Sequence, residues 1–147
     1  MLTSVCAAPR WVDEMIAGRP YATADELLRT ADHALGQLTV ADLDAALAGH
    51  PRIGAKPEGT AAEQSRREQS GVDAEDTALA TALAEGNRAY AERFGRIYLV
   101  CASGRTGPEL LTILRERLGH DQDPELAVTR SELGKINRLR LERMVSS

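Results

Sequence analysis

The sequence predicts an all-α protein, a single domain built as a bundle of about seven helices. Ala, Leu, Glu and Arg dominate the 147 residues while aromatic residues make up 3%, a composition that favours helix over sheet. Residues that begin helices recur along the chain, each followed by apolar side chains at helical spacing. The length fits one domain, which we place over residues 1–147.

Two helix starts lie in the first third of the chain. Thr23–Glu26 is a capping box and is followed by apolar residues at helical spacing. Thr39–Asp42 predicts a second start, followed by the apolar residues of a short helix. Gly49 then offers a stop, and Pro51 cannot continue a helix.

The middle of the chain is predicted to be a loop, two helices and one unusual segment. Pro51–Gly59 is rich in Pro and Gly, which is typical of a loop. A polar helix is predicted over Ala61–Ser70, and Asp73 could cap a longer helix that extends through Tyr90. Ile97–Ala102 has strand-like composition without a partner strand, so we expect a buried extended or helical crossing of the core.

The last third predicts two more helices. Thr106–Glu109 is a further capping box, and Gly119 offers the stop of the helix that it begins. Asp123–Glu125 starts the final helix. Its predicted apolar stripe includes Leu126, Leu133, Ile136, Leu139 and Met144.

Composition and charge exclude several kinds of partner. The net charge is −4, so the totals give no basic face of the kind that binds phosphates of nucleic acids. The longest apolar run, Ile97–Ala102, is too short to cross a bilayer, and the first residues do not form a secretory signal. Cys6 and Cys101 lie far apart and predict buried thiols in a reducing compartment. We therefore expect a cytoplasmic protein with neither a nucleic-acid nor a membrane partner.

His50 is the histidine best placed for chemistry. It lies where a predicted helix ends, immediately before Pro51, and a substrate can approach such a junction. The alternative is a C-terminal cap whose positive charge the helix dipole favours, and position alone favours this alternative. Spacings typical of metal ligands, of a nucleophilic serine and of phosphate-binding glycine loops are absent from the sequence. We therefore expect neither a metal nor the large cofactor classes.

Two further groups of polar residues follow His50. Ser65, Glu68 and Gln69 can share one face of a helix, either to hydrogen-bond a polar heterocycle or as an exposed polar surface. Arg105 directly precedes a predicted helix start, and an arginine beside free backbone N–H groups makes a good anion site. A capped turn that carries a solvated arginine is an equal alternative.

Together these motifs resemble those of the OHCU decarboxylases, where OHCU is 2-oxo-4-hydroxy-4-carboxy-5-ureidoimidazoline. They occur in the order and approximate spacing of that family, and the resemblance extends from about Arg10 to Leu118. Each motif alone has little specificity, whereas four in register are fairly specific. The motifs are His50-Pro-Arg-Ile-Gly, Ser65-x-x-Glu68-Gln69, Asn87-x-x-Tyr90-x-x-x-Phe94-Gly95 and Ser103-Gly-Arg105-Thr106.

The resemblance implies an all-helical homodimer that decarboxylates OHCU, a small molecule of urate breakdown, to (S)-allantoin without a metal or organic cofactor. His50 matches the catalytic histidine of the family, and Glu68 matches the carboxylate that supports it. The implied substrate-binding residues are Pro51, which would pack against the ring, Ser65 and Gln69, which would hydrogen-bond the substrate, and Arg105, its arginine anchor.

Two other functions remain open at the level of sequence. One is a non-catalytic helical interaction module, in which Arg105 and the neighbouring helix end bind a carboxylate of a partner protein. The other is a related enzyme that acts on a different ureido or imidazole substrate. In the first case the polar motif residues would be scattered over the surface instead of converging on one pocket.

Overall fold

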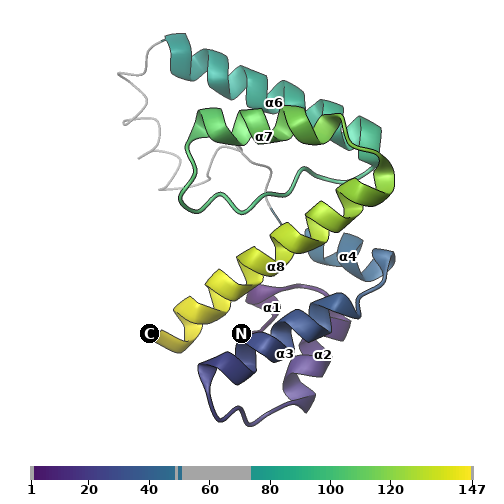
Figure 1. Cartoon of the computed structure of the whole chain (residues 1–147), viewed down its shortest axis with the longest axis vertical. Coiled ribbons are helices and arrows are strands. Elements are labelled where there is room, and N and C mark those ends of the chain that lie inside the picture. Colours follow the sequence, from purple (N-terminus) through teal and green to yellow (C-terminus); the bar gives the residue numbers. More distant parts are fainter. Residues whose placement is uncertain (1, 49, 51–73, 147) are drawn as a thin grey trace. The chain divides into compact units, whose positions relative to one another are not determined.

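The computed structural model describes residues 2–48, 50 and 74–146. These residues form seven helices and contain no strand (Figure 1), so the all-α prediction is confirmed for this part of the chain. The chain divides into two compact units. The first comprises residues up to 50 together with 99–101 and the residues from 122 onward, and the second comprises the intervening segments. Whether the chain is a single domain stays a prediction.

The first unit contains five helices. They are α1 (Leu2–Val5), α2 (Pro9–Ala17), α3 (Ala24–Gly36), α4 (Val40–Leu47) and α8 (Gln122–Ser146). The predicted starts of α3 and α4 are confirmed, because Thr23 accepts a hydrogen bond from the Glu26 amide at 3.1 Å and Thr39 forms a complete capping box with Asp42. Neither α1 nor α2 is among the predicted helices. The α2 helix begins at Pro9, a position where the missing N–H of proline costs nothing.

The core of the first unit forms around Trp11. Its indole is fully buried, and Nε1 donates to the Ala31 carbonyl of α3 at 3.2 Å. Burial of an aromatic side chain with its N–H satisfied gives a large hydrophobic contribution at little polar cost. The other large apolar side chains with no exposed surface are Met15, Leu43, Leu133 and Leu141.

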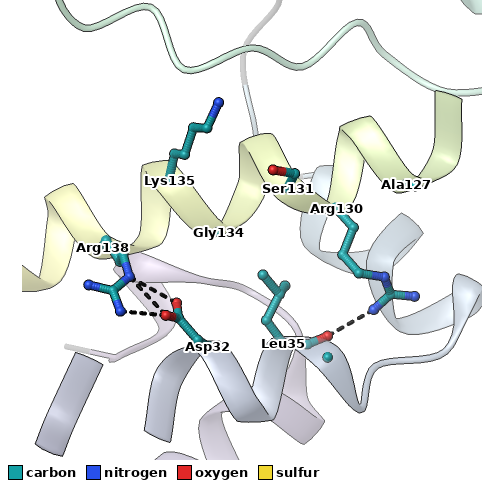
Figure 2. Close-up of a pocket in the computed structure, with 9 residues that line it drawn as sticks. Asp32, Leu35, Ala127, Arg130, Ser131, Gly134, Lys135 and Arg138 are labelled. Carbon is teal, nitrogen blue, oxygen red and sulfur yellow. Dashed lines mark hydrogen bonds and ion pairs between the residues drawn. The ribbon is translucent and has the colours of Figure 1, made fainter. Parts of the chain in front are cut away.

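The α8 helix crosses α3 at a close contact (Figure 2). A Cβ atom at Gly134 would lie 2.9 Å from Cδ2 of Leu35, so the absence of a side chain permits this approach. Two arginines secure the crossing. Arg138 binds the Asp32 carboxylate through Nε and Nη2, and Arg130 Nη1 donates to the Leu35 carbonyl at 2.8 Å. The hollow beside this crossing is therefore lined by cations that already have partners.

The buried face of α8 differs from the predicted apolar stripe. Leu133 is buried as expected, whereas Leu126, Ile136, Leu139 and Met144 are only partly buried. Polar residues occupy much of the buried face, namely Glu125, Thr129, Glu132 and Asn137. The predicted apolar stripe of α8 is therefore wrong apart from Leu133. A helix that buries polar side chains does not show its buried face as a regular spacing of apolar residues.

One of those polar residues holds the extended segment of the first unit. Glu132 accepts a hydrogen bond from the Cys101 amide at 3.0 Å and another from the Lys135 ammonium group at 2.6 Å. Residues 97–102 are not helical, and Leu99 and Val100 are buried. Of the two predicted forms for this segment, the extended crossing is the one observed.

The second unit contains α6 (Ala74–Phe94) and α7 (Gly107–Leu118), which lie side by side (Figure 1). The predicted start of α7 is confirmed, because Thr106 accepts from the Glu109 amide at 3.3 Å. A Cβ atom at Gly86 would lie 2.3 Å from Cδ2 of Leu114, so the helices meet at a glycine. The predicted helix over Ala61–Ser70 and the predicted cap at Asp73 lie outside the described residues.

Aromatic side chains fill the core of the second unit. The ring centroids of Tyr90 and Phe94 are 4.6 Å apart, and those of Tyr90 and Tyr98 are 5.5 Å apart. Tyr98 donates its hydroxyl to the Leu110 carbonyl at 3.0 Å. The buried guanidinium of Arg117 lies 4.9 Å from the Tyr98 ring centroid, a geometry in which the face of the ring attracts the cation. Tyr90 and Phe94 of the third sequence motif are thus core residues.

None of the helices described has both the length and the apolar character needed to span a membrane.

Candidate active site

The imidazole of His50 lies just beyond the C-terminal end of α4. The capping box at Thr39 fixes where α4 begins, and Leu43 and Leu47 anchor its buried face. The His50 amide continues the helical turn by donating to the Leu47 carbonyl at 3.0 Å. The side chain is partly buried, so the imidazole is held at a defined place at the end of a rigid element.

The surroundings of His50 favour its neutral form. Burial lowers the pKa of His50 below the ordinary value of 6.5, and the positive charge of Arg140 lowers it further. At neutral pH the ring therefore carries one nitrogen that accepts a proton and one that donates. This direction of shift does not fit a cationic C-terminal cap, for which the helix dipole would raise the pKa. It fits a group that takes up and returns a proton.

Arg140 is a residue that the sequence motifs did not single out. Its Nη1 donates to the Val5 carbonyl at 3.0 Å and to the Ser4 carbonyl at 3.4 Å, so the C-terminal end of α1 orients the guanidinium. Among the described residues, the hydrogen bonds of Arg140 are made through this one nitrogen. Its other N–H groups retain the capacity to bind an anion in two places at once.

An open hollow borders Arg140. It is lined by Ser4, Val5, Arg140, Arg143 and Met144, and its volume is about 540 Å³, within the usual range for sites that bind small molecules. Arg140 and Arg143, both on α8, make this hollow a place that favours a small anion. No such hollow could be inferred from the sequence, because it joins the first residues of the chain to nearly the last.

Two buried polar groups complete this neighbourhood. Cys6 is 1% exposed, and burial raises the pKa of its thiol, so it stays protonated in spite of the hydrogen-bonding groups and the Arg140 charge nearby. The side chain of Asn137 lies within hydrogen-bonding reach of that thiol and lowers its pKa, by less than burial raises it. Within the described part of the chain, neither the Oδ1 nor the Nδ2 atom of Asn137 has a hydrogen-bond partner.

Most of the site residues predicted from sequence lie outside the described residues. These are Pro51, Ser65, Glu68 and Gln69, and their implied roles stay predictions. His50 belongs to the first unit and Arg105 to the second. The convergence of these side chains on one cavity therefore stays a prediction too.

Arg105 lies in an exposed turn before α7. Its amide donates to the Ala102 carbonyl at 3.1 Å, and the first turn of α7 is capped by Thr106. The carboxylates of Glu109 and Glu116 line the same open hollow as Arg105. Locally this is a capped turn that carries a surface arginine, and a role of Arg105 in anion binding stays a prediction.

Within the described ranges, no group of three or more His, Cys, Asp and Glu side chains could hold a metal ion.

Comparison with known proteins identifies the family. The family model for OHCU decarboxylase matches residues 1–142. The chain belongs to the OHCU decarboxylase family. The resemblance seen in the sequence motifs is thus confirmed, and with it, at the level of the family, an assignment to the carboxy-lyases of urate degradation.

Two curated proteins show the extent of the similarity. The 2-oxo-4-hydroxy-4-carboxy-5-ureidoimidazoline decarboxylase of Amia calva is 30% identical over 145 residues, which cover 96% of this chain and 80% of that protein. The uric acid degradation bifunctional protein TTL of Arabidopsis thaliana is 33% identical over 146 residues. The chain spans 45% of the length of that second relative, so it is similar to one part of a longer protein.

Two solved structures have a similar fold. A crystal structure of OHCU decarboxylase in the presence of (S)-allantoin matches with a TM-score of 0.81 and 32% identity, covering 99% of this chain and 96% of that one. A crystal structure of (S)-allantoin synthase matches with a TM-score of 0.69 and 20% identity, covering 97% of this chain and 47% of that one. The second likeness concerns the fold alone.

Proposed function

We propose that this protein decarboxylates OHCU to (S)-allantoin and uses its own side chains alone for the chemistry. The observation that carries the proposal is the partly buried, neutral imidazole of His50 held near the Arg140 guanidinium, in a chain that belongs to the OHCU decarboxylase family. An imidazole supplies proton transfer and a guanidinium supplies charge for an anionic substrate. Those are the two things that this reaction requires of a protein.

The substrate provides its own electron sink. The ring carbon that carries the carboxylate also carries a hydroxyl group and adjoins a C=N bond. When the bond to the carboxylate breaks, CO₂ leaves and the electron pair of the broken bond stays with the ring. That pair forms a C=C bond, while the electrons of the C=N bond move to nitrogen. Protonation of that nitrogen and of the carbon that bears the ureido group, with loss of the hydroxyl proton, gives allantoin. The electrons balance without an external carrier, so an electron-accepting cofactor has no part in the proposal.

His50 is assigned the proton transfer. A neutral ring accepts the proton of the substrate hydroxyl on one nitrogen, and the resulting imidazolium returns a proton. The backbone of His50 is held at the end of α4, and an imidazole that approaches the substrate from that side delivers the proton to one face of the ring, which gives one enantiomer. Glu68, as the resemblance implies, would hold the imidazole in the required orientation.

Arg140 and Arg105 are assigned to the charge of the substrate. Arg140 lies within electrostatic reach of His50 and is oriented by two carbonyls, which suits it to hold the anionic substrate during bond cleavage. Arg105 is the anchor that the resemblance implies. Pro51 would pack against the ring, and Ser65 and Gln69 would hydrogen-bond the imidazolone and ureido groups.

The assembly and compartment belong to the proposal as well. The family resemblance implies a homodimer, which light scattering coupled to size-exclusion chromatography would test through the molar mass in solution. We place the protein in the cytoplasm, where the free thiols of Cys6 and Cys101 would stay reduced.

The decisive assay follows optical activity. OHCU is generated freshly from urate by the two enzymes that precede this step, and circular dichroism then reports the formation of (S)-allantoin. Spontaneous decay gives a racemate, so the expected result is a chiral signal that grows with the concentration of the protein. A signal equal to that of the protein-free control would overturn the proposal and would favour a different ureido substrate or a non-catalytic binding module.

A further inference from the structure

Asn137 is a buried polar residue for which the fold itself provides no explanation. Its side chain is 2% exposed and meets the Cys6 thiol, but its Oδ1 and Nδ2 atoms make no hydrogen bond of normal geometry among the described residues. A buried carboxamide that makes no hydrogen bond destabilises the folded state, and most such groups in proteins are paired. An apolar residue of similar shape would avoid that cost, so the presence of asparagine calls for another explanation.

The position of Asn137 on α8 places it next to the candidate active site. Asn137 and Arg140 are three residues apart, so they share one face of the helix. Cys6 is a common neighbour, because its thiol lies beside Asn137 and within electrostatic reach of Arg140. Arg140 in turn acts on His50. The unpaired carboxamide therefore belongs to the same polar neighbourhood as the imidazole and the guanidinium.

The neighbouring thiol does not satisfy the carboxamide. A thiol is a weak donor and a weak acceptor, whereas a carboxamide presents two N–H groups and a carbonyl oxygen. Those groups form the complement of a urea or cyclic amide, which also presents an N–H group beside a carbonyl. Because water is excluded from this place, a hydrogen bond made here is stronger than one at the surface.

We infer that Asn137 is a substrate-binding residue whose carboxamide pairs with the urea or ring-amide group of the ligand bound near His50 and Arg140. The inference rests on the proposed function and extends it, because it names a specificity residue outside the family motifs found in the sequence. It assigns to Asn137 the recognition of the neutral N–H and carbonyl edge of the substrate, while Arg140 binds the negative charge.

The first test uses Asn137→Leu, which keeps the approximate shape and removes the hydrogen-bonding atoms. The KM for OHCU is expected to rise about tenfold, which corresponds to the loss of a hydrogen bond in a site without water. The midpoint of thermal unfolding of the unliganded protein is expected to rise by about 2–4 °C, because an unpaired buried group has been removed. A residue with a purely structural role would show the opposite change in stability.

Cys6→Ala is the matched control. It removes the thiol beside Asn137 and leaves the carboxamide in place, so the KM is expected to stay within about twofold of the wild-type value. If Cys6→Ala raises the KM as much as Asn137→Leu does, Asn137 acts through its packing against Cys6 and the inference is overturned. An unchanged KM for Asn137→Leu in an active protein also overturns it.

The second test needs neither turnover nor a variant. The side-chain amide resonances of Asn137 are assigned in a ¹⁵N-labelled sample, and (S)-allantoin is added until the remaining spectrum stops changing. These resonances are expected to shift while that of the buried Asn87 stays in place. Saturation without a shift at Asn137 overturns the inference. The assay of optical activity separates the two proposals. Wild-type protein that fails to make (S)-allantoin refutes the proposed function. Active protein in which neither the KM nor the amide resonances respond at Asn137 refutes the residue assignment alone.

Discussion

Gly86→Ala is expected to destabilise the protein, although alanine is the better helix former. Gly86 lies in the interior of α6, and an added Cβ would lie 2.3 Å from Cδ2 and 3.1 Å from Cγ of Leu114. Ordinary contacts between carbon atoms are about 3.5–4.0 Å, so Cδ2 of the leucine must retreat by about 1.2–1.7 Å. Leu114 has no exposed surface, and a closely packed core offers little space for that retreat.

The sign of the effect follows from two opposing magnitudes. Replacement of glycine by alanine within a helix contributes about 1 kcal/mol to stability. Overpacking of a core by one methyl group costs about 1–3 kcal/mol. The net expectation is a loss of about 1 kcal/mol in the free energy of unfolding, which lowers the midpoint of thermal unfolding by roughly 2–4 °C for a chain of this size.

Thermal and urea unfolding followed by circular dichroism measure the change, and Gly36→Ala is the matched control. A Cβ atom at Gly36 in α3 meets nothing within 4 Å, so that variant is expected to gain about 0.4–1 kcal/mol. The same substitution should thus have opposite signs at the two positions. If Gly86→Ala is as stable as Gly36→Ala, the close approach of α6 and α7 is not the constraint described above.

Three further predictions concern the chemistry. His50→Gln should lower kcat by at least about 10²-fold while the circular dichroism spectrum of the folded protein is retained, and near-normal turnover would remove His50 from the mechanism. Arg140→Met should raise the pKa of His50, because it removes a positive charge that lowers this pKa. His50 is then neutral over a narrower pH range, so the acid limb of the kcat/KM profile should move to higher pH. An acid limb that does not move would contradict the electrostatic coupling of Arg140 to His50. Arg105→Ala should raise KM with kcat and the acid limb unchanged, whereas a fall in kcat at constant KM would contradict an anchoring role.

Local signals in the sequence were sufficient for much of the fold. Thr23, Thr39 and Thr106 each begin a helix where the capping pattern predicted one, because a cap is a contact between residues three positions apart. The short α1 and α2 helices escaped prediction. The buried face of α8 escaped it as well, because residues such as Glu132 are buried through hydrogen bonds to distant parts of the chain.

In the candidate site too, a residue placed by a local pattern was predicted and a residue placed by tertiary packing was not. His50 was found from its position at the end of a helix, and the structure holds it there. Arg140 was not found, because what brings it near His50 is the packing of α8 and α1, which no local pattern records. In the sequence, Asn137 and Arg140 are two of the four polar residues between Leu133 and Leu141, and nothing in the local pattern sets them apart.

The path of the chain between its two units limits how the protein can be divided. The backbone leaves one unit for the other after residues 50, 98, 101 and 121, so neither unit is an uninterrupted stretch of sequence. A single proteolytic cut or gene truncation therefore cannot release either unit with all its segments. A partner fused at either end of this chain leaves all four of these crossings uninterrupted.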